Sequence, residues 1–414
     1  MPAGLHLIFD KSAIQSFSVD ETNWLDHFYT TVITPLFYAE VLADLEKQVS
    51  TGKTPEQVVG ALAHKTPDMN STACVHHTRL ALAVLFGEEI PTDGRIPRGQ
   101  GKVVELGDQR GIYYEKSPEE EALDRWHNGE FLDVERQFAK NWRRNLCNVN
   151  HDREYAYFQK WFLMGKPKSL PEVKTMTDAY LDASPQDGVM RFGMTMIGVS
   201  EEAQVEIMQR WRAANNHPVR EYAPYVRHLL GVDLFCNLAT AADLIGRDRP
   251  KGKADNRVDM AYLYYLPFCH VFVSGDKLHK RVVPLFLRPD QTFIDAAEMK
   301  ADLAKLDAHY WALPDAEKEK GLHKIAMNPP LDGDYLIAKL WDKRGREWRE
   351  NALKPPLLDP EHDAKIIAEL KKISDMAKAA APNTRLPLKD AAFMTINRTM
   401  LRKKGKWKRV ADDV

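Results

Sequence analysis

The stretch VDMAYLYYLPFCHVFVSGDK, residues 258–277, contains the pattern that decides the fold. It predicts a short amphipathic helix, a turn and a buried strand, HVFVS (270–274), which runs directly into Asp276 and Lys277. A further acid, Asp259, lies just upstream. The charged end of such a strand can simply face water, or it can place a carboxylate in a functional site at the edge of the sheet. The choice depends on whether other acids occupy equivalent places.

The first fifty residues repeat the pattern of an apolar strand followed by a helix. LHLIF (5–9) predicts a buried strand, and TVIT (31–34) predicts a second strand after a helical region. Thr34 then suits the N-cap, and Pro35 the first position, of a helix over 35–49. This alternation is typical of a parallel sheet with helical crossovers, so we expect an α/β fold.

The rest of the chain predicts mainly helices. We expect helices over 234–246, 295–310, 331–343 and 360–380, a polar loop over 247–257 and an exposed Gly/Pro/Arg-rich loop at 91–111. Strand patterns return only near residue 270. The simplest organisation is a sheet domain interrupted by a helical insertion, with boundaries at 1–53 (sheet, first part), 54–230 (mostly helical insertion), 231–300 (sheet, second part), 301–400 (helical region) and 401–414 (basic tail).

Composition limits the class of protein. With 44% hydrophobic and 28% charged residues the 414-residue chain has material for a globular core. Its 58 basic and 59 acidic residues nearly cancel, so a nucleic-acid partner has to be held by local patches rather than by a global basic field. The strongest patch is LRKKGKWKRV (401–410), for which we expect a disordered tail that contacts nucleic acid, with Trp407 stacking on a base.

The cysteines and the apolar segments indicate a location. The four cysteines form no CxxC pair, which argues against a zinc ribbon or a disulfide scaffold and favours a reducing compartment. The N-terminal apolar run is broken at once by charged residues, and no apolar segment reaches the ~20 residues that span a bilayer. We therefore expect a cytoplasmic protein with no membrane partner.

Acids occupy equivalent places in several parts of the predicted sheet. Asp10 directly follows strand 5–9, as Asp276 follows strand 270–274. Glu40 falls in the second turn of the helix after the second strand, and Asp259 near the beginning of the helix that leads into HVFVS. Because functional groups gather at the carboxyl ends of parallel strands, we expect these four carboxylates to converge.

Like charges at close range repel, so such a cluster needs a counter-ion. Hard oxygen ligands with room for water suit Mg²⁺ or Mn²⁺. An ion of this kind activates water and stabilises the charge that develops on a phosphodiester. The pattern therefore predicts a metal site at the edge of the sheet.

Three segments of the chain, 5–16, 32–45 and 258–277, resemble the PIN-domain nuclease family. That family has an apolar strand ending in Asp with Ser or Asn two residues on, a helical Glu, a helical Asp and a strand ending in [ST]-x-D. The resemblance implies an α/β/α sandwich and a Mg²⁺- or Mn²⁺-dependent nuclease that acts most often on RNA. The gap between the helical Glu and the helical Asp is longer here than in compact PIN domains. The matching residues are Asp10 with Ser12, Glu40, Asp259, and Ser274 with Asp276.

Other interpretations of these residues stay open. The strand-end acids can cap the turns that follow them, Glu40 can be a solvated helix acid, and Asp259 can be a first-turn acid favoured by the helix dipole. Asp255 competes with Asp259 for the third acidic position, although we expect it to cap the helix. Contact with substrate is one possible role of Ser12, Ser274 and Lys277; the other is to stabilise only the turns in which they lie. The alternative function is a catalytically silent PIN-like scaffold that binds nucleic acid or a protein.

Overall fold

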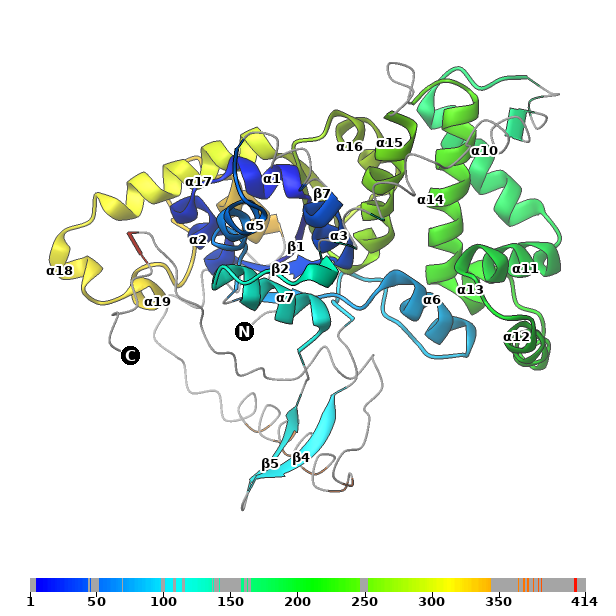
Figure 1. Ribbon diagram of the computed structural model, residues 1–414, viewed down its shortest axis with the longest axis horizontal. Coiled ribbons are helices and arrows are strands. Elements are labelled where there is room, and N and C mark those ends of the chain that lie inside the picture. Colours follow the sequence, from blue (N-terminus) through cyan, green and yellow to red (C-terminus); the bar gives the residue numbers. More distant parts are fainter. Residues whose placement is uncertain are drawn as a thin grey trace.

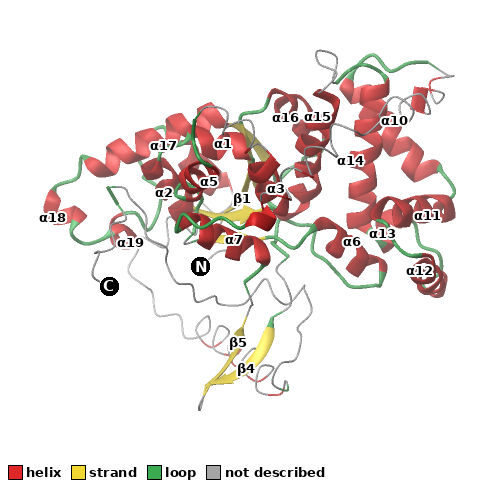
Figure 2. Ribbon diagram, viewed as in Figure 1, coloured by secondary structure: helices red, strands yellow, loops and turns green. Residues whose placement is uncertain are grey.

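A five-stranded parallel sheet forms the centre of the protein (Figures 1 and 2). Its strands lie in the order β3-β2-β1-β6-β7, so β1 and β6 are direct neighbours, with Leu7 opposite Val271. The predicted α/β class and the shared sheet for LHLIF and HVFVS are therefore confirmed. The strands are β1 (Leu5–Phe9), β2 (Tyr29–Ile33), β3 (Ser71–Ala73), β6 (Val271–Ser274) and β7 (Thr292–Asp295).

The structure is a computed structural model, and part of the chain lies outside its description. It describes residues 5–43, 52–97, 101–135, 165–245 and 252–343, apart from 69, 107–108 and 114–115, and isolated positions elsewhere that include Lys406 and Trp407.

Both faces of the sheet are buried, which explains why its central strands are almost continuously apolar. Along β1, Leu7 and Phe9 face one hydrophobic core, whereas Ile8 faces a second core on the opposite side. Along β6, Val273 faces the first core and Phe272 the second. The alternation follows from the two-residue period of a strand, and it fixes the register of the sheet.

Helices supply the rest of each core (Figure 1). The first face is covered by α1 (Lys11–Ser16), α2 (Val19–Phe28), α3 (Pro35–Ala43), α5 (Pro55–Ala63), α7 (Pro118–His127) and α17 (Ala296–Trp311). The second core runs from the sheet into a helical lobe made of α6 (His77–Leu85), α10 (Leu170–Ala183), α11 (Gln186–Ile197), α12 (Glu201–Ala213), α13 (Val219–Tyr222) and α14 (Pro224–Ala241).

Four short strands were missed from the sequence. β3 lies within the segment expected to be mostly helical, and its three residues, STA, are too few and too polar to show alternation. The loop expected at 91–111 contains β4 (Lys102–Leu106), which pairs with β5 (Gln109–Tyr113) as a separate antiparallel hairpin. β7 is only four residues long, TFID, and two of them are polar.

The helix expected at 258–266 begins earlier and changes type. α15 (Gly252–Ala261) starts inside the polar segment that we expected to be a loop, and a 3₁₀ helix, η2 (Tyr262–Phe268), continues it. Asp259 therefore lies in the last turn of α15, not near its beginning, and Asp255 lies inside the helix rather than at its cap. The predicted cap of α3 is confirmed, because the Thr34 hydroxyl oxygen accepts from the backbone N–H of Phe37 at 3.3 Å.

The C-terminal part continues the helical pattern. The helix expected at 295–310 is α17, and α18 (Asp315–Lys318) and α19 (Leu322–Ile325) follow it. After β6 the chain forms α16 (Lys277–Val282) and η3 (Val283–Leu285). Among the residues that the structure describes, no helix is both long and apolar enough to cross a membrane.

Two residues of the basic tail are described, and they contradict the expectation that this run is a disordered end. The Trp407 ring lies edge-on to Trp24, with centroids 5.1 Å apart, and its indole nitrogen donates to Asp307 at 2.7 Å. The Lys406 ammonium donates to the same carboxylate at 2.8 Å. Trp407 is thus engaged by α2 and α17. The remaining tail, like most of the helix expected at 360–380, lies outside the described residues.

A close approach at the amino end of the sheet needs a glycine. Gly94 has φ +97°, and a Cβ there would lie 2.3 Å from Nε2 of His270. Its N–H donates to the carbonyl of Pro267 at 2.8 Å, and its carbonyl contacts the His6 ring. Gly87 has a similar φ of +90°, but a Cβ at that residue would have nothing within 4 Å.

We expect Gly94→Ala to lower the free energy of unfolding by about 2 kcal/mol more than Gly87→Ala. Both substitutions strain a left-handed backbone, which costs about 1–3 kcal/mol, but only the first also collides with a packed side chain. Denaturant unfolding of the two variants measures the difference. Equal losses would show that the His270 ring moves away without cost.

Candidate active site

The four predicted acids lie on elements that meet at the carboxyl edge of the sheet, where β1 leads into α1 and β6 into α16. Asp10 directly follows β1, and Asp276 lies two residues after β6, the neighbouring parallel strand. Glu40 lies in the second turn of α3, as expected. Burial raises the pKa of Asp259 most, and the negative charges of Asp276, Glu40 and Asp10 raise it further, so Asp259 lies within electrostatic reach of the other three acids.

Asp10 is the most constrained of these acids. Its Oδ1 accepts from the Ala13 N–H at 2.9 Å and so caps α1. Its Oδ2 accepts from the Ser274 hydroxyl at 2.6 Å, and the Ser12 hydroxyl lies 2.8 Å from both carboxylate oxygens. The capping role that we weighed as the alternative is therefore present, but it uses only one of the two oxygens.

A buried histidine, His279, faces the second oxygen of Asp10. Its Nδ1 lies 3.5 Å from Asp10 Oδ2 and 2.7 Å from the Ser274 hydroxyl. Its Nε2 lies 2.8 Å from the backbone carbonyl of Asp259 and must carry a proton there, because a carbonyl only accepts. Burial opposes the charged ring, but the hydrogen bond and charge of Asp10 raise the pKa of His279 to about 9. His279 is thus a buried cation, which also helps to hold the pKa of Asp10 below its ordinary value against the effect of burial.

Glu40 has its own partners. The Lys11 ammonium lies 3.4 Å from Glu40 Oε1, and both side chains are shielded, with exposed fractions of 5% and 20%. The Tyr262 hydroxyl donates to Glu40 Oε2 at 2.7 Å. Because Lys11 directly follows Asp10, the start of α1 contributes both one acid of the cluster and the cation that faces another. These contacts rule out the interpretation of Glu40 as a freely solvated helix acid.

Asp259 is half-buried, and its carboxylate has no hydrogen-bond partner among the residues that the structure describes. Burial and then the neighbouring acids raise the pKa of Asp259 to about 8, although His279 opposes this. Its place in the last turn of α15 adds to the strain, because the carbonyl end of a helix disfavours a negative charge. The alternative of a first-turn acid stabilised by the helix dipole is therefore wrong.

Asp276 caps α16, with its Oδ1 accepting from the Leu278 N–H at 2.5 Å. Its Oδ2 has no hydrogen-bond partner within the described part of the chain. The Ser274 hydroxyl also accepts from the Asp276 N–H at 2.9 Å, and the Ser12 hydroxyl accepts from the Gly275 N–H at 3.0 Å. The two serines therefore position the acids. Lys277 is exposed, and the side chain of Asp255 lies outside the described residues.

The charges of the cluster do not balance. Four carboxylates face two buried or shielded cations, Lys11 and His279, which leaves two negative charges in excess when all groups are ionised. One divalent cation would balance them. The donor set fits such an ion, since Asp259 and Asp276 retain oxygens without partners and all four side chains are hard oxygen ligands. In the described ranges, however, no three acidic, histidine or cysteine side chains are already arranged as ligands of one ion.

Lys11, Tyr262 and His279 were missed by the sequence analysis. Each is adjacent to a recognised position: Lys11 follows Asp10, Tyr262 lies three residues after Asp259, and His279 three residues after Asp276. The spacing of three residues within a helical turn is the signal that could have found His279. The contact between Tyr262 and Glu40 joins segments far apart in the chain and has no local signal.

Comparison with protein-family models, with curated proteins and with solved structures finds no match for this chain. The interpretation of the site therefore depends on its own geometry and charges.

We expect the effects of His279→Leu and Asp10→Asn on stability to be strongly coupled. Removing His279 leaves a buried carboxylate without its cation, a change that typically costs about 3–5 kcal/mol. In an Asp10→Asn background that carboxylate is absent, so the same substitution should cost at least about 1 kcal/mol less. Denaturant unfolding of the two single variants and the double variant measures the coupling. Losses that add within about 0.5 kcal/mol would contradict it.

Proposed function

We propose that the protein is a metal-dependent nuclease of the PIN-like type, which hydrolyses a phosphodiester of RNA at the carboxyl edge of the sheet. The observation that carries the proposal is Asp259. A half-buried carboxylate without a hydrogen-bond partner in the described residues, whose pKa is raised by burial and then by three other acids, is costly to keep ionised unless a cation binds there. Perturbed groups of this kind concentrate at functional sites.

Asp10, Glu40, Asp259 and Asp276 would hold one or two Mg²⁺ or Mn²⁺ ions. When bound, such an ion supplies an activated water and neutralises charge on the phosphodiester. The protein's own groups orient the ligands. Ser274 and His279 fix the second oxygen of Asp10, and Lys11 fixes Glu40. Lys277, which is exposed and follows Asp276, would contact a phosphate of the substrate.

The second candidate function, a catalytically silent scaffold, has support from the same contacts. Lys11 and His279 already neutralise part of the acidic cluster, and buried cations can take over the structural role of a metal. The nuclease is favoured by the two negative charges in excess when all groups are ionised, and by the oxygens of Asp259 and Asp276 that have no hydrogen-bond partner in the described residues. RNA is preferred over DNA on the family resemblance. The expected stacking of Trp407 on a base is not retained, since α2 and α17 already engage that ring.

The decisive variant is Asp259→Asn. We expect it to abolish Mg²⁺- or Mn²⁺-dependent cleavage of single-stranded RNA while the metal-free protein unfolds at the wild-type temperature or above. The substitution keeps the shape of the side chain and removes one like charge from a repulsive cluster. We also expect added Mg²⁺ to raise the unfolding temperature of the wild type, and of this variant much less, because only a bound ligand stabilises the folded state. Cleavage assays with and without EDTA and thermal unfolding measure both.

The matched control is Asp233→Asn. Burial raises the pKa of Asp233 to about 6, but its partner is the Tyr264 hydroxyl rather than other acids. This variant should keep both the cleavage and the response to Mg²⁺, even where it loses stability. Wild-type cleavage by Asp259→Asn would place the site elsewhere, and a wild type that neither cleaves nor responds to Mg²⁺ would favour the silent scaffold.

A further inference from the structure

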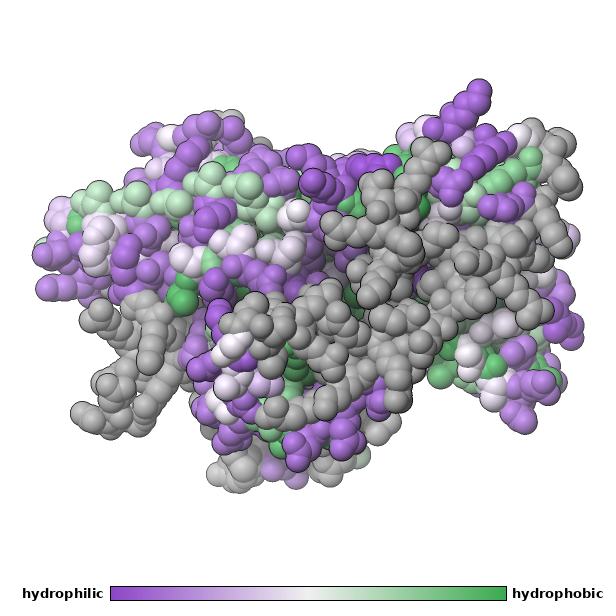
Figure 3. All heavy atoms as spheres, turned by 45° about the horizontal axis from the view of Figure 1, so that its top comes forward, coloured by the Kyte–Doolittle hydropathy of each residue, from purple (hydrophilic) through white to green (hydrophobic). Residues whose placement is uncertain are grey.

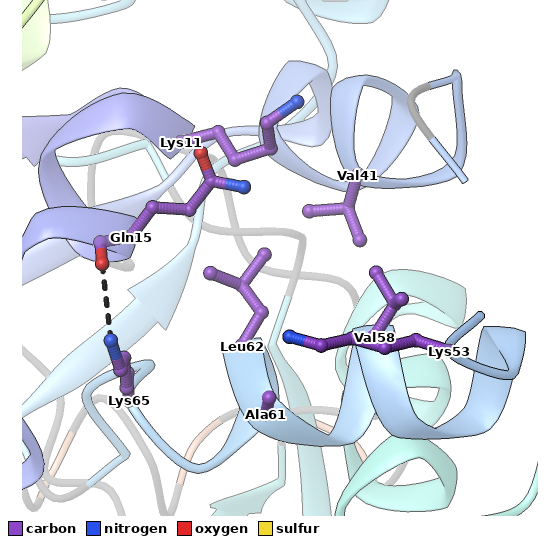
Figure 4. A pocket seen from close by; sticks show the side chains of 8 residues that line it. All are labelled: Lys11, Gln15, Val41, Lys53, Val58, Ala61, Leu62 and Lys65. Atoms are coloured by element: carbon purple, nitrogen blue, oxygen red, sulfur yellow. Dashed lines mark hydrogen bonds between the residues drawn. The ribbon is translucent and has the colours of Figure 1, made fainter. Parts of the chain in front are cut away.

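A cavity of about 150 Å³ lies between α1, α3 and α5, beside the acidic cluster (Figure 4). Liquid water takes about 30 Å³ per molecule, so the cavity has room for several waters or for a phosphate group. Its lining combines three lysines, Lys11, Lys53 and Lys65, with an apolar wall. The wall is formed by Val41, Val58, Ala61 and Leu62.

Among the described residues no acid lines this cavity, and the acid that pairs with Lys11, Glu40, is not part of the lining. The Lys65 ammonium donates to the backbone carbonyl of Gln15 at 3.1 Å, and burial together with the charge of Lys300 lowers the pKa of Lys65. Lys53 is exposed, and in the described part of the chain it has neither an ion pair nor a hydrogen bond. A bound anion would relieve the repulsion at Lys65 and give Lys53 a partner.

Figure 4 shows how these groups surround the space. The Lys53 ammonium points between Val58 and Leu62, and the side-chain amide of Gln15 projects toward the cavity from α1. Positive and polar groups thus line the rim, while the aliphatic side chains of α3 and α5 form the wall. An anion attached to a less polar group, such as a phosphate on a ribose, fits both surfaces.

Lys11 connects the cavity to the acidic cluster. It lines the cavity, and its ammonium lies 3.4 Å from Glu40 Oε1. A single side chain, that of Lys11, therefore lies between the cavity and the carboxylate of Glu40. Figure 3 shows that the described part of the surface on this side of the molecule is mostly hydrophilic.

We propose that this lysine-lined cavity binds a phosphate of the nucleic-acid strand, next to the phosphodiester that lies at the acidic cluster. The inference rests on the proposed nuclease function and adds the way the strand is positioned. The phosphate is either a 5′-terminal phosphate or one within the backbone, since both present the same anionic oxygens.

The test measures binding of single-stranded RNA, with and without a 5′-phosphate, in EDTA so that no cleavage occurs. Ala61 is exposed on α5 and lines the cavity, so Ala61→Glu places a carboxylate there, and Ala61→Gln places a neutral side chain of the same size. We expect the Glu variant to bind at least about fivefold more weakly than the Gln variant, because only the former repels a phosphate. The unfolding temperatures of both variants establish that each is folded.

A second pair of variants tests the lysines. Lys53→Gln should reduce the slope of log binding constant against log salt concentration by about 0.7, the value for one phosphate contact on a single strand. The matched control is Lys168→Gln, which removes an equally exposed lysine from the start of α10, outside the cavity, and should leave affinity and slope unchanged.

The outcomes separate the inference from the proposed function. If Ala61→Glu weakens the binding of 5′-phosphorylated RNA alone, the cavity binds the terminal phosphate. If it weakens the binding of both RNAs equally, the cavity binds a backbone phosphate. Equal binding by the Glu and Gln variants overturns the cavity as a phosphate site, even where the wild type cleaves RNA with Mg²⁺. If the Glu variant binds more weakly but the wild type never cleaves, the nuclease proposal fails and the phosphate site remains.

Discussion

The parallel pairing of β1 with β6 is the constraint on which the site depends. The two strands come from segments separated by most of the chain, yet they lie side by side because both are apolar on both faces and need cover from two cores. Parallel neighbours end at the same edge, so Asp10 and the Ser274–Asp276 turn emerge together. The Asp10 N–H even extends the strand pairing, donating to the carbonyl of Val273 at 3.3 Å.

Electrostatics then decides what this edge can do. Four carboxylates at close range would destabilise the fold, and the protein offsets part of that repulsion with a buried histidine and a shielded lysine. Each cation fixes the acid that it faces: His279 orients Asp10, and Lys11 orients Glu40. Asp259 and Asp276 keep oxygens that no other group bonds in the part of the chain that the structure describes. The division between oriented and free carboxylates is what a site needs if it is to hold its shape and still accept an ion.

The sequence was informative where a feature is local. An apolar run before an acid predicted β1 and β6, and a Thr-Pro pair predicted the start of α3. It was uninformative where pairing comes from neighbours in space, as for β3, a three-residue strand that joins the sheet only because it lies beside β2. The same dependence on neighbours in space limited the prediction of the site. The four acids could be predicted from their places on strands and helices. The contact of Tyr262 with Glu40 and the cavity lined by Lys11 could not, because both depend on packing between distant segments.

The anchoring of Trp407 gives the C-terminal segment a different physical character from a free end. Lys406 and Trp407 are bound to Asp307, which lies 99 and 100 positions earlier in the sequence. A contact between residues so far apart has to offset the entropy of bringing distant parts of the chain together. The anchor therefore holds only while α2 and α17 keep their places, and unfolding of either helix would release the tryptophan.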